Sequence, residues 1–152
     1  MLGRDEDVAM YNARHARVAK AIQLKLWDNV TNSFAQLITD GAAGGQFYRR
    51  WSMTSLYPLA AKAATDEQAV ALVTQYLLNP AKFCVQPLPD DVTAVNVTGP
   101  CTFGSTSIAA DDPAFKEQMY VRGRAWAPQA MLVWLGLNEY DHLPVVRQAS
   151  TR

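Results

Sequence analysis

Three residues between positions 120 and 126 have side chains suited to binding a sugar. Tyr120 and Trp126 offer aromatic rings whose apolar faces stack on sugar rings and whose polar tips form hydrogen bonds. Arg122 lies between them in the sequence and can donate several hydrogen bonds to hydroxyls or to a carboxylate. The combination indicates a carbohydrate site, and the competing interpretation is that the aromatic rings belong to the core.

Other aromatic residues allow the same two interpretations, among them Trp51, Tyr57 and Trp134. Trp134 stands in an apolar stretch of helical character, so we assign it to the hydrophobic core. Trp126 follows a long loop and directly precedes a helix, a position that fits either role. The choice for Trp126 therefore depends on its neighbours in the fold.

Asp111 and Asp112 are the acidic pair that could carry catalysis. Two carboxylates can act as general acid and general base in glycoside hydrolysis. Side chains of adjacent residues diverge in an extended loop, so we expect one aspartate to form a turn and the other to line a pocket or join a salt bridge. The serines lack the G-x-S-x-G pattern, and neither His15 nor His142 stands near a nucleophile signature. We therefore assign no catalytic residue.

Composition argues against nucleic-acid, metal and nucleotide sites. The 14 Lys and Arg residues balance 14 Asp and Glu residues, whereas a nucleic-acid groove needs a basic excess. Only two His occur, without C-x-x-C or H-x-x-x-H spacing for zinc. The glycines at 41, 44 and 45 lack the following Lys-Ser or Lys-Thr of a phosphate-binding loop. We expect no nucleic-acid partner, no metal and no cofactor.

The 152 residues suffice for one globular unit. No apolar run reaches the roughly 18 residues of a membrane span, and charged residues occupy positions 4–7, where a signal peptide would be apolar. As written, the chain is expected to have no membrane segment and a cytoplasmic location. Cys84 and Cys101 can form a disulfide or remain two free thiols, and the missing export signal favours free thiols.

Apolar residues recur at helical spacing in two segments. From Asp7 to Trp27 they form one stripe, made by Val8, Tyr11, His15, Val18, Ile22 and Trp27. A second helix follows Thr65, which can cap it together with Gln68, and ends at Asn79-Pro80. Between these helices, the glycines near position 44 indicate a short hairpin or an irregular loop.

Three further segments complete the expected order of elements. A helix is predicted from about Trp51, with a kink or break at Pro58. Residues 83–115 show no helical period and predict a long, packed irregular loop. A helix from about Pro128 to Tyr140 is apolar nearly all round, so we expect it to be buried. Another helix begins after residue 141, and the fold class is therefore mainly all-α.

The stretch "DDPAFKEQMYVRGRAWAPQAMLVWLGLNEY" resembles the helical-toroid glycosidases of glycoside hydrolase family 63 and the related mannosylglycerate and trehalose hydrolases. Those enzymes share D-P-x-[YF], then Y-W-R-G-x-x-W-x-P-x-N-Y-L, then G-L-x-x-Y. The matching residues here are Asp112, Pro113, Phe115, Tyr120, Arg122, Gly123, Trp126, Pro128, Gly136, Leu137 and Tyr140. Upstream, "LWDNVTNSF" resembles L-W-D-x-x-x-G-x-[FY], and "SLYPLAAKAATDEQA" and "LLNPAKF" resemble two further family segments.

The resemblance implies an (α/α)6 toroid, of which residues 1–152 form a part that lacks the N-terminal and C-terminal portions. It implies an inverting hydrolase acting on an oligosaccharide or small glycoside, whose catalytic acid and base both lie outside this chain. Tyr120 and Trp126 match positions that line the subsite of the cleaved sugar, and Arg122 matches an arginine that holds the pocket carboxylates or the loop. The remainder of the toroid would be a partner.

Two departures from the family pattern bear on substrate binding. Val121 replaces an aromatic residue, and Ala130 replaces the usual asparagine. The loss of a stacking ring and a hydrogen-bonding group leaves two alternatives open beside the glycosidase. One is a non-catalytic carbohydrate-binding protein, and the other is a helical interaction module without sugar chemistry.

Overall fold

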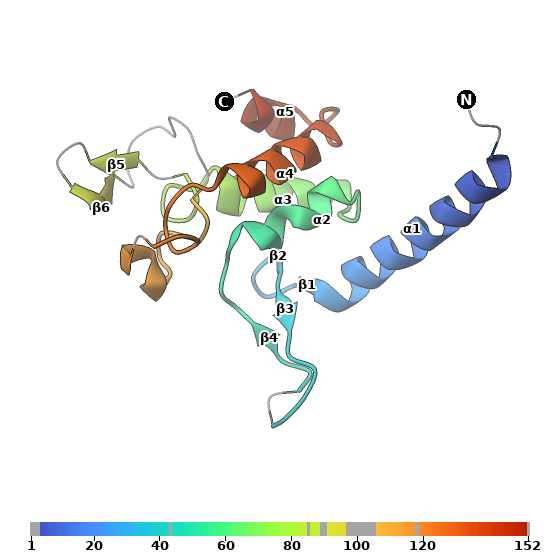
Figure 1. The fold of residues 1–152 in the computed structure, drawn as a ribbon, viewed down its shortest axis with the longest axis horizontal. Helices are drawn as coiled ribbons and strands as arrows, with labels where there is room; N and C mark the ends of the chain where they lie inside the picture. Colours follow the sequence, from blue (N-terminus) through green and yellow to red (C-terminus); the bar gives the residue numbers. More distant parts are fainter. Residues whose placement is uncertain are drawn as a thin grey trace.

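A computed structural model describes residues 4–42, 44–84, 86–88, 91–96, 106–117 and 119–151. Figure 1 shows a central group of helices, α2 to α5, with the long helix α1 extending away on one side. The hairpin β5–β6 projects on the opposite side. The described residues are mainly helical, which confirms the predicted fold class.

Helix α1 (Asp5–Leu26) confirms the first predicted helix. Asp5, Glu6 and Asp7 lie in its first turn, where the positive end of the helix dipole favours acidic side chains. Near its C-terminal end Ile22 and Leu26 pack against the core, and in the middle of the helix His15 Nε2 lies 2.6 Å from the Ala61 carbonyl oxygen. The N-terminal part of the predicted apolar stripe is exposed, namely Val8, Tyr11 and Val18.

Two short antiparallel hairpins follow α1, where the sequence indicated either a short hairpin or an irregular loop. The first pairs β1 (Trp27–Asp28) with β2 (Ser33–Phe34), and the second pairs β3 (Gln36–Leu37) with β4 (Phe47–Tyr48). Asn32 stands at the glycine position of the L-W-D-x-x-x-G pattern and has a φ of 50°. Asparagine tolerates this left-handed conformation better than most residues with a side chain, so the turn survives the replacement.

The helix predicted from Trp51 is shorter than expected. A 3-10 turn, η1 (Met53–Leu56), leads into α2 (Tyr57–Ala60), and Lys62 ends the segment with a φ of 48°. Pro58 lies in the first turn of α2, where its missing N–H breaks no helical hydrogen bond. Pro58 therefore starts a helix here rather than kinking one.

The second predicted helix is confirmed with its cap. Helix α3 (Asp66–Leu72) continues into a π-helical turn, η2 (Val73–Leu77). The Thr65 hydroxyl accepts a hydrogen bond from the Gln68 N–H at 3.2 Å, and the Thr65 N–H donates to Gln68 Oε1 at 2.9 Å. In this capping box, each side chain accepts a hydrogen bond from the other residue's backbone N–H at the start of the helix.

Helix α4 (Ala127–Asn138) packs closely on α2, and α5 (Pro144–Ser150) packs on α4. A methyl group added at Gly136 would lie 2.6 Å from the Ala60 nitrogen and 2.8 Å from Leu59 Cβ, so only glycine permits this approach. Tyr140 follows α4, and its hydroxyl both donates to and accepts from the backbone of buried Ala64. The G-L-x-x-Y residues are thus packing residues.

The prediction that α4 is buried all round, with Trp134 in the core, is wrong. Val133, Gly136 and Leu137 face the protein, whereas Met131, Leu132, Trp134 and Leu135 are exposed. Trp134 is 50% exposed. The reason is that a helix with apolar residues on every side is buried only where packing partners surround it, and the described elements that pack on α4, which include α2, α5 and η1, leave these four side chains exposed.

The predicted irregular loop contains regular structure. Strands β5 (Gln86–Leu88) and β6 (Asp91–Asn96) form an antiparallel hairpin, and η3 (Pro113–Glu117) is a short 3-10 helix. Cys84 is disulfide-bonded, so the expectation of a free thiol at this position is wrong. That expectation came from an inference about compartment, which does not bear on side-chain geometry. Cys101 lies outside the described residues.

None of the described helices is long and apolar enough to cross a membrane.

The close contact at Gly136 predicts that Gly136→Ala lowers the free energy of unfolding by about 1–3 kcal/mol, because the new methyl group overpacks the contact with α2. Alanine favours helices by about 1 kcal/mol over glycine, so a gain in stability would show that the contact is not tight. Urea denaturation measures the effect. Asn138→Ala, at an exposed position of the same helix, serves as the control.

Candidate functional site

One extended segment, residues 106–109, connects the parts of the candidate site. It lies between residues 51–53 and 124–125 and bonds to both, through the Ser52–Ile108 and Thr106–Ala125 bridges. Ser107 is buried and makes three of the hydrogen bonds that hold this arrangement. Its carbonyl accepts from the Met53 N–H at 3.1 Å, its N–H donates to the Arg124 carbonyl at 3.0 Å, and its hydroxyl accepts from the Gly123 N–H at 3.2 Å.

The structure brings two of the sequence-predicted site residues together. The rings of Tyr120 and Trp126 lie with their centroids 5.4 Å apart at an angle of 52°. Tyr120 is 71% exposed and has a φ of 41°, which places it at a sharp turn. Trp126 is partly exposed and immediately precedes α4. The pair, which we call the Tyr120–Trp126 platform, presents apolar ring surface to solvent.

Arg122, the third predicted site residue, forms an ion pair with Glu117 at the end of η3. Its N–H also donates to the Met119 carbonyl at 2.7 Å. Asp111 and Asp112 are bound to other cations, as described below. In this structure Arg122 therefore ties the turn that carries Tyr120 to η3.

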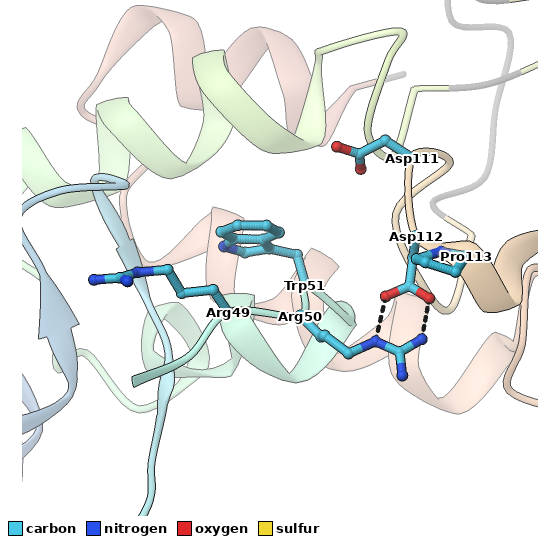
Figure 2. A pocket seen from close by; sticks show the side chains of 6 residues that line it. All are labelled: Arg49, Arg50, Trp51, Asp111, Asp112 and Pro113. Atoms are coloured by element: carbon cyan, nitrogen blue, oxygen red, sulfur yellow. Dashed lines mark hydrogen bonds and ion pairs between the residues drawn. The ribbon is translucent and has the colours of Figure 1, made fainter. Parts of the chain in front are cut away.

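A pocket of about 270 Å³ lies beside Trp51 (Figure 2). Its lining residues are Arg49, Arg50, Trp51, Asp111, Asp112 and Pro113. Sequence reasoning identified Trp51 and the two aspartates as candidates but missed the two arginines. The only sequence signal for them was their position directly before Trp51, which does not reveal a partner.

Asp112 is held by Arg50 in a two-bonded ion pair. Arg50 Nε donates to Asp112 Oδ2 at 2.7 Å, and a second guanidinium nitrogen donates to Oδ1. The Ala114 N–H also donates to Oδ1, at 2.9 Å. The Arg50 guanidinium holds the pKa of Asp112 below its ordinary value of 3.8. A carboxylate that stays ionised and has both oxygens occupied is unsuited to protonating a leaving group.

Asp111 points away from Asp112, as Figure 2 shows, and forms an ion pair with Lys82 at 2.5 Å. This divergence confirms the expectation for neighbouring residues in a loop. Both aspartates are ion-pair partners, and Asp112 also forms the turn into η3, where its carbonyl accepts from the Phe115 N–H at 2.9 Å.

Trp51 is fixed on two sides. Its indole N–H donates to the Ser33 hydroxyl at 2.8 Å, and its ring centroid lies 5.8 Å from that of Tyr76. The Lys82 ammonium lies 4.6 Å from the Trp51 ring centroid, within cation–π distance. The orientation of the indole is therefore set before any ligand arrives.

Asp28 makes the third ion pair near the pocket. It is buried and accepts from Arg49 Nε at 2.5 Å, from the Val30 N–H at 3.0 Å and from the Thr31 hydroxyl at 3.0 Å. The bond from Arg49 holds the pKa of Asp28 below its ordinary value. The aspartate of the L-W-D pattern therefore closes the first hairpin turn and positions Arg49.

The described residues contain no group of three or more His, Cys, Asp or Glu side chains that could hold a metal ion.

Residues 1–151 match the family model of the mannosylglycerate hydrolase MGH1-like glycoside hydrolase domain. The chain belongs to this family. The family match agrees with the resemblance carried by the D-P, R-G-x-x-W and G-L-x-x-Y patterns, and it shows a glycoside hydrolase domain. A comparison with curated proteins finds no match.

Within this glycoside hydrolase domain, the motif residues divide into two groups. Asp28, Gly136 and Tyr140 close a turn or pack helices, since each contacts backbone or buried groups. Tyr120 is exposed and Trp126 is partly exposed. Residues of the second group are the ones free to meet a ligand.

The Arg50–Asp112 pair predicts a pH-dependent contribution to stability. Because the pKa of Asp112 is lowered by folding, its stabilisation is complete above pH 3.8 and is lost as the pH falls through the lower folded-state value. We expect Asp112→Asn to lower the melting temperature at pH 7 by roughly 3–6 °C. The difference from the wild type should shrink as the pH falls below 3.8.

Thermal unfolding followed by circular dichroism over a pH series measures this effect. Asp66→Asn, which changes an exposed aspartate in a surface pair with His142, is the matched control. A difference between wild type and Asp112→Asn that stays constant down to the lowest pH would rule out the ion pair as its cause.

Proposed function

We propose that this chain forms one wall of the sugar-binding site of an inverting glycoside hydrolase that acts on an oligosaccharide or small glycoside. The Tyr120–Trp126 platform supplies the stacking surface for the sugar at the cleaved bond. The remainder of an (α/α)6 toroid supplies the catalytic acid and base. Residues 1–152 are a partial domain on this proposal, and the family match supports its glycosidase character.

The observation that carries the proposal is the exposed Tyr120–Trp126 platform in a domain of a glycoside hydrolase family. The two rings come from opposite ends of one loop and lie 5.4 Å apart. Water-exposed aromatic rings held side by side match what a sugar ring needs, which is an apolar face with polar atoms at its edge. The ion pair between Arg122 and Glu117 supports the loop, so Arg122 acts as a positioning residue.

The ion pairs support placing the catalytic carboxylates elsewhere. An inverting enzyme needs one carboxylic acid that gives up a proton and one carboxylate that activates water. Asp112 stays ionised beside Arg50, and Asp111 is paired with Lys82. Neither has the unpaired acidic group that the first role requires, in line with the resemblance, which puts both catalytic residues outside this chain.

The exposed face of α4 supports association with further helices. Met131, Leu132, Trp134 and Leu135 form an apolar surface over about one and a half turns. Apolar patches of this kind mark surfaces that another element covers. We propose that further helices of the toroid pack here, which makes the missing part of the domain the first partner of this chain.

Val121 and Ala130 weaken the platform relative to the family pattern. Val121 is exposed beside Tyr120 and adds no ring. A site with one platform and no opposite wall should bind sugars in the millimolar range or more weakly, below what calorimetry resolves. The alternative of a non-catalytic carbohydrate-binding protein predicts tighter binding by the chain alone, because its site would be complete.

A nuclear magnetic resonance titration with glucose and mannose oligosaccharides tests the platform. We expect the indole N–H resonance of Trp126 to shift, while that of Trp134, on the exposed face of α4, stays unchanged. Trp126→Ala should reduce binding about tenfold or more, as loss of a stacking ring implies. An unmoved Trp126 resonance at saturating sugar, or full binding by Trp126→Ala, would refute the platform.

The exposed face of α4 predicts self-association of the isolated chain. Met131→Glu combined with Leu135→Lys should suppress it, because the pair adds charge and can form a salt bridge one turn apart. Analytical ultracentrifugation compares the double variant with the wild type. A wild-type chain that is a single monomeric species, with a cooperative melt, would contradict the prediction. The double variant is also the sample for the titrations.

A further inference from the structure

The pocket beside Trp51 is separate from the Tyr120–Trp126 platform and has no role in the function proposed above. Trp51 forms an apolar wall, and Asp111, Asp112, Arg49 and Arg50 place polar atoms around it (Figure 2). Its volume of about 270 Å³ falls just below the range for drug-sized ligands, which suits a ligand of one small ring.

The charges around this pocket are balanced. Arg49 pairs with Asp28, Arg50 with Asp112, and Lys82 with Asp111. An anion entering the pocket would have to compete with the carboxylate already bound to each of these cationic side chains. A cation would have to compete with the cationic side chain already bound to each carboxylate. A neutral ligand meets neither penalty, so the pocket favours an uncharged molecule.

The remaining hydrogen-bonding capacity is that of a site for hydroxyl groups. The Asp111 carboxylate is about half exposed and keeps acceptor sites beyond its bond to Lys82. Arg49 and Arg50 are also partly exposed, and each guanidinium has more donors than its partner carboxylate uses. An indole wall surrounded by in-plane donors and acceptors fits a neutral polyhydroxylated ring.

The pocket and the platform are joined through one closed loop. Residues 111–113 of the pocket follow the extended segment 106–109, and the chain returns through Tyr120 to residues 124–125, which pair with the same segment. Neighbouring extended segments lie about 4.8 Å apart, so residues 51–53 and 124–125 are separated by about 10 Å. A backbone spacing of this size is larger than that of two neighbouring sugar rings and corresponds to the first and third rings of a trisaccharide.

We propose that the Trp51 pocket is a second sugar subsite, which holds a neutral sugar unit of the same oligosaccharide whose other end contacts the Tyr120–Trp126 platform. The inference rests on the proposed function, because it takes the platform as the first subsite. It adds the substrate class, an uncharged chain of at least three sugar rings, and assigns Trp51 and Asp111 to its recognition.

The indole resonances of an isotope-labelled chain test the two sites separately, after assignment with Trp→Phe variants. We expect gluco- or manno-trisaccharides to shift the Trp51 and Trp126 resonances along the same saturation curve, because one molecule bridges both sites. Free glycerate, an anionic probe, should leave Trp51 unchanged. A Trp126 shift without a Trp51 shift overturns the second subsite and leaves the proposed function standing. No shift of either resonance overturns the proposed function itself.

Two matched variants add a measurement that does not depend on Trp51 packing. Asp111→Asn removes a pocket carboxylate from its pair with Lys82, and Glu139→Gln does the same for a surface pair with Lys62, also 2.5 Å long. Asp111→Asn should weaken trisaccharide binding about tenfold, and Glu139→Gln by less than about twofold. Equal affinities for the two variants would overturn the subsite.

Discussion

The hydrogen bonds of Ser107 join the helical core to both parts of the site. Its carbonyl binds the start of η1, and its N–H and hydroxyl bind the turn before α4. Each of these groups is buried, so loss of a partner would leave an unsatisfied polar group and cost about 1–3 kcal/mol. The positions of Trp51 and Trp126 therefore depend on the backbone and hydroxyl groups of Ser107.

Ion pairing gives the pocket its rigidity and limits its chemistry. A carboxylate bound to a guanidinium holds its neighbours in place, but it has lost the proton that acid catalysis needs. Sugar recognition does not need an acidic proton. It needs hydrogen-bond donors and acceptors that are fixed in place and whose charges balance, because such groups select hydroxyl groups. The same arrangement that makes Asp112 a poor acid makes the pocket a suitable binding surface, which separates recognition from bond cleavage in this domain.

Local patterns in the sequence predicted local structure well. The Thr65–Gln68 cap, the helix α1 and the start of α4 near Pro128 all depend on residues within one or two turns, and the structure has each of them. The Arg50–Asp112 pair joins residues 62 positions apart, and no pattern in the sequence predicts it. The prediction that Trp134 is buried failed for a related reason, since burial depends on which elements surround a helix. The prediction that Tyr120 and Trp126 belong to one site came from a family pattern rather than from hydrophobic periodicity.

Helix α1 is a long helix that extends away from the body of this domain. Its 22 residues span about 33 Å. Ile22 and Leu26 pack against the core, and His15 Nε2 lies 2.6 Å from the Ala61 carbonyl oxygen. A small rotation about Ile22 and Leu26 would move the N-terminal turn by several times the displacement at the anchor (Figure 1). The side chains of the N-terminal turns are largely exposed, so the amides there should exchange with solvent at rates set by helix fraying rather than by global unfolding.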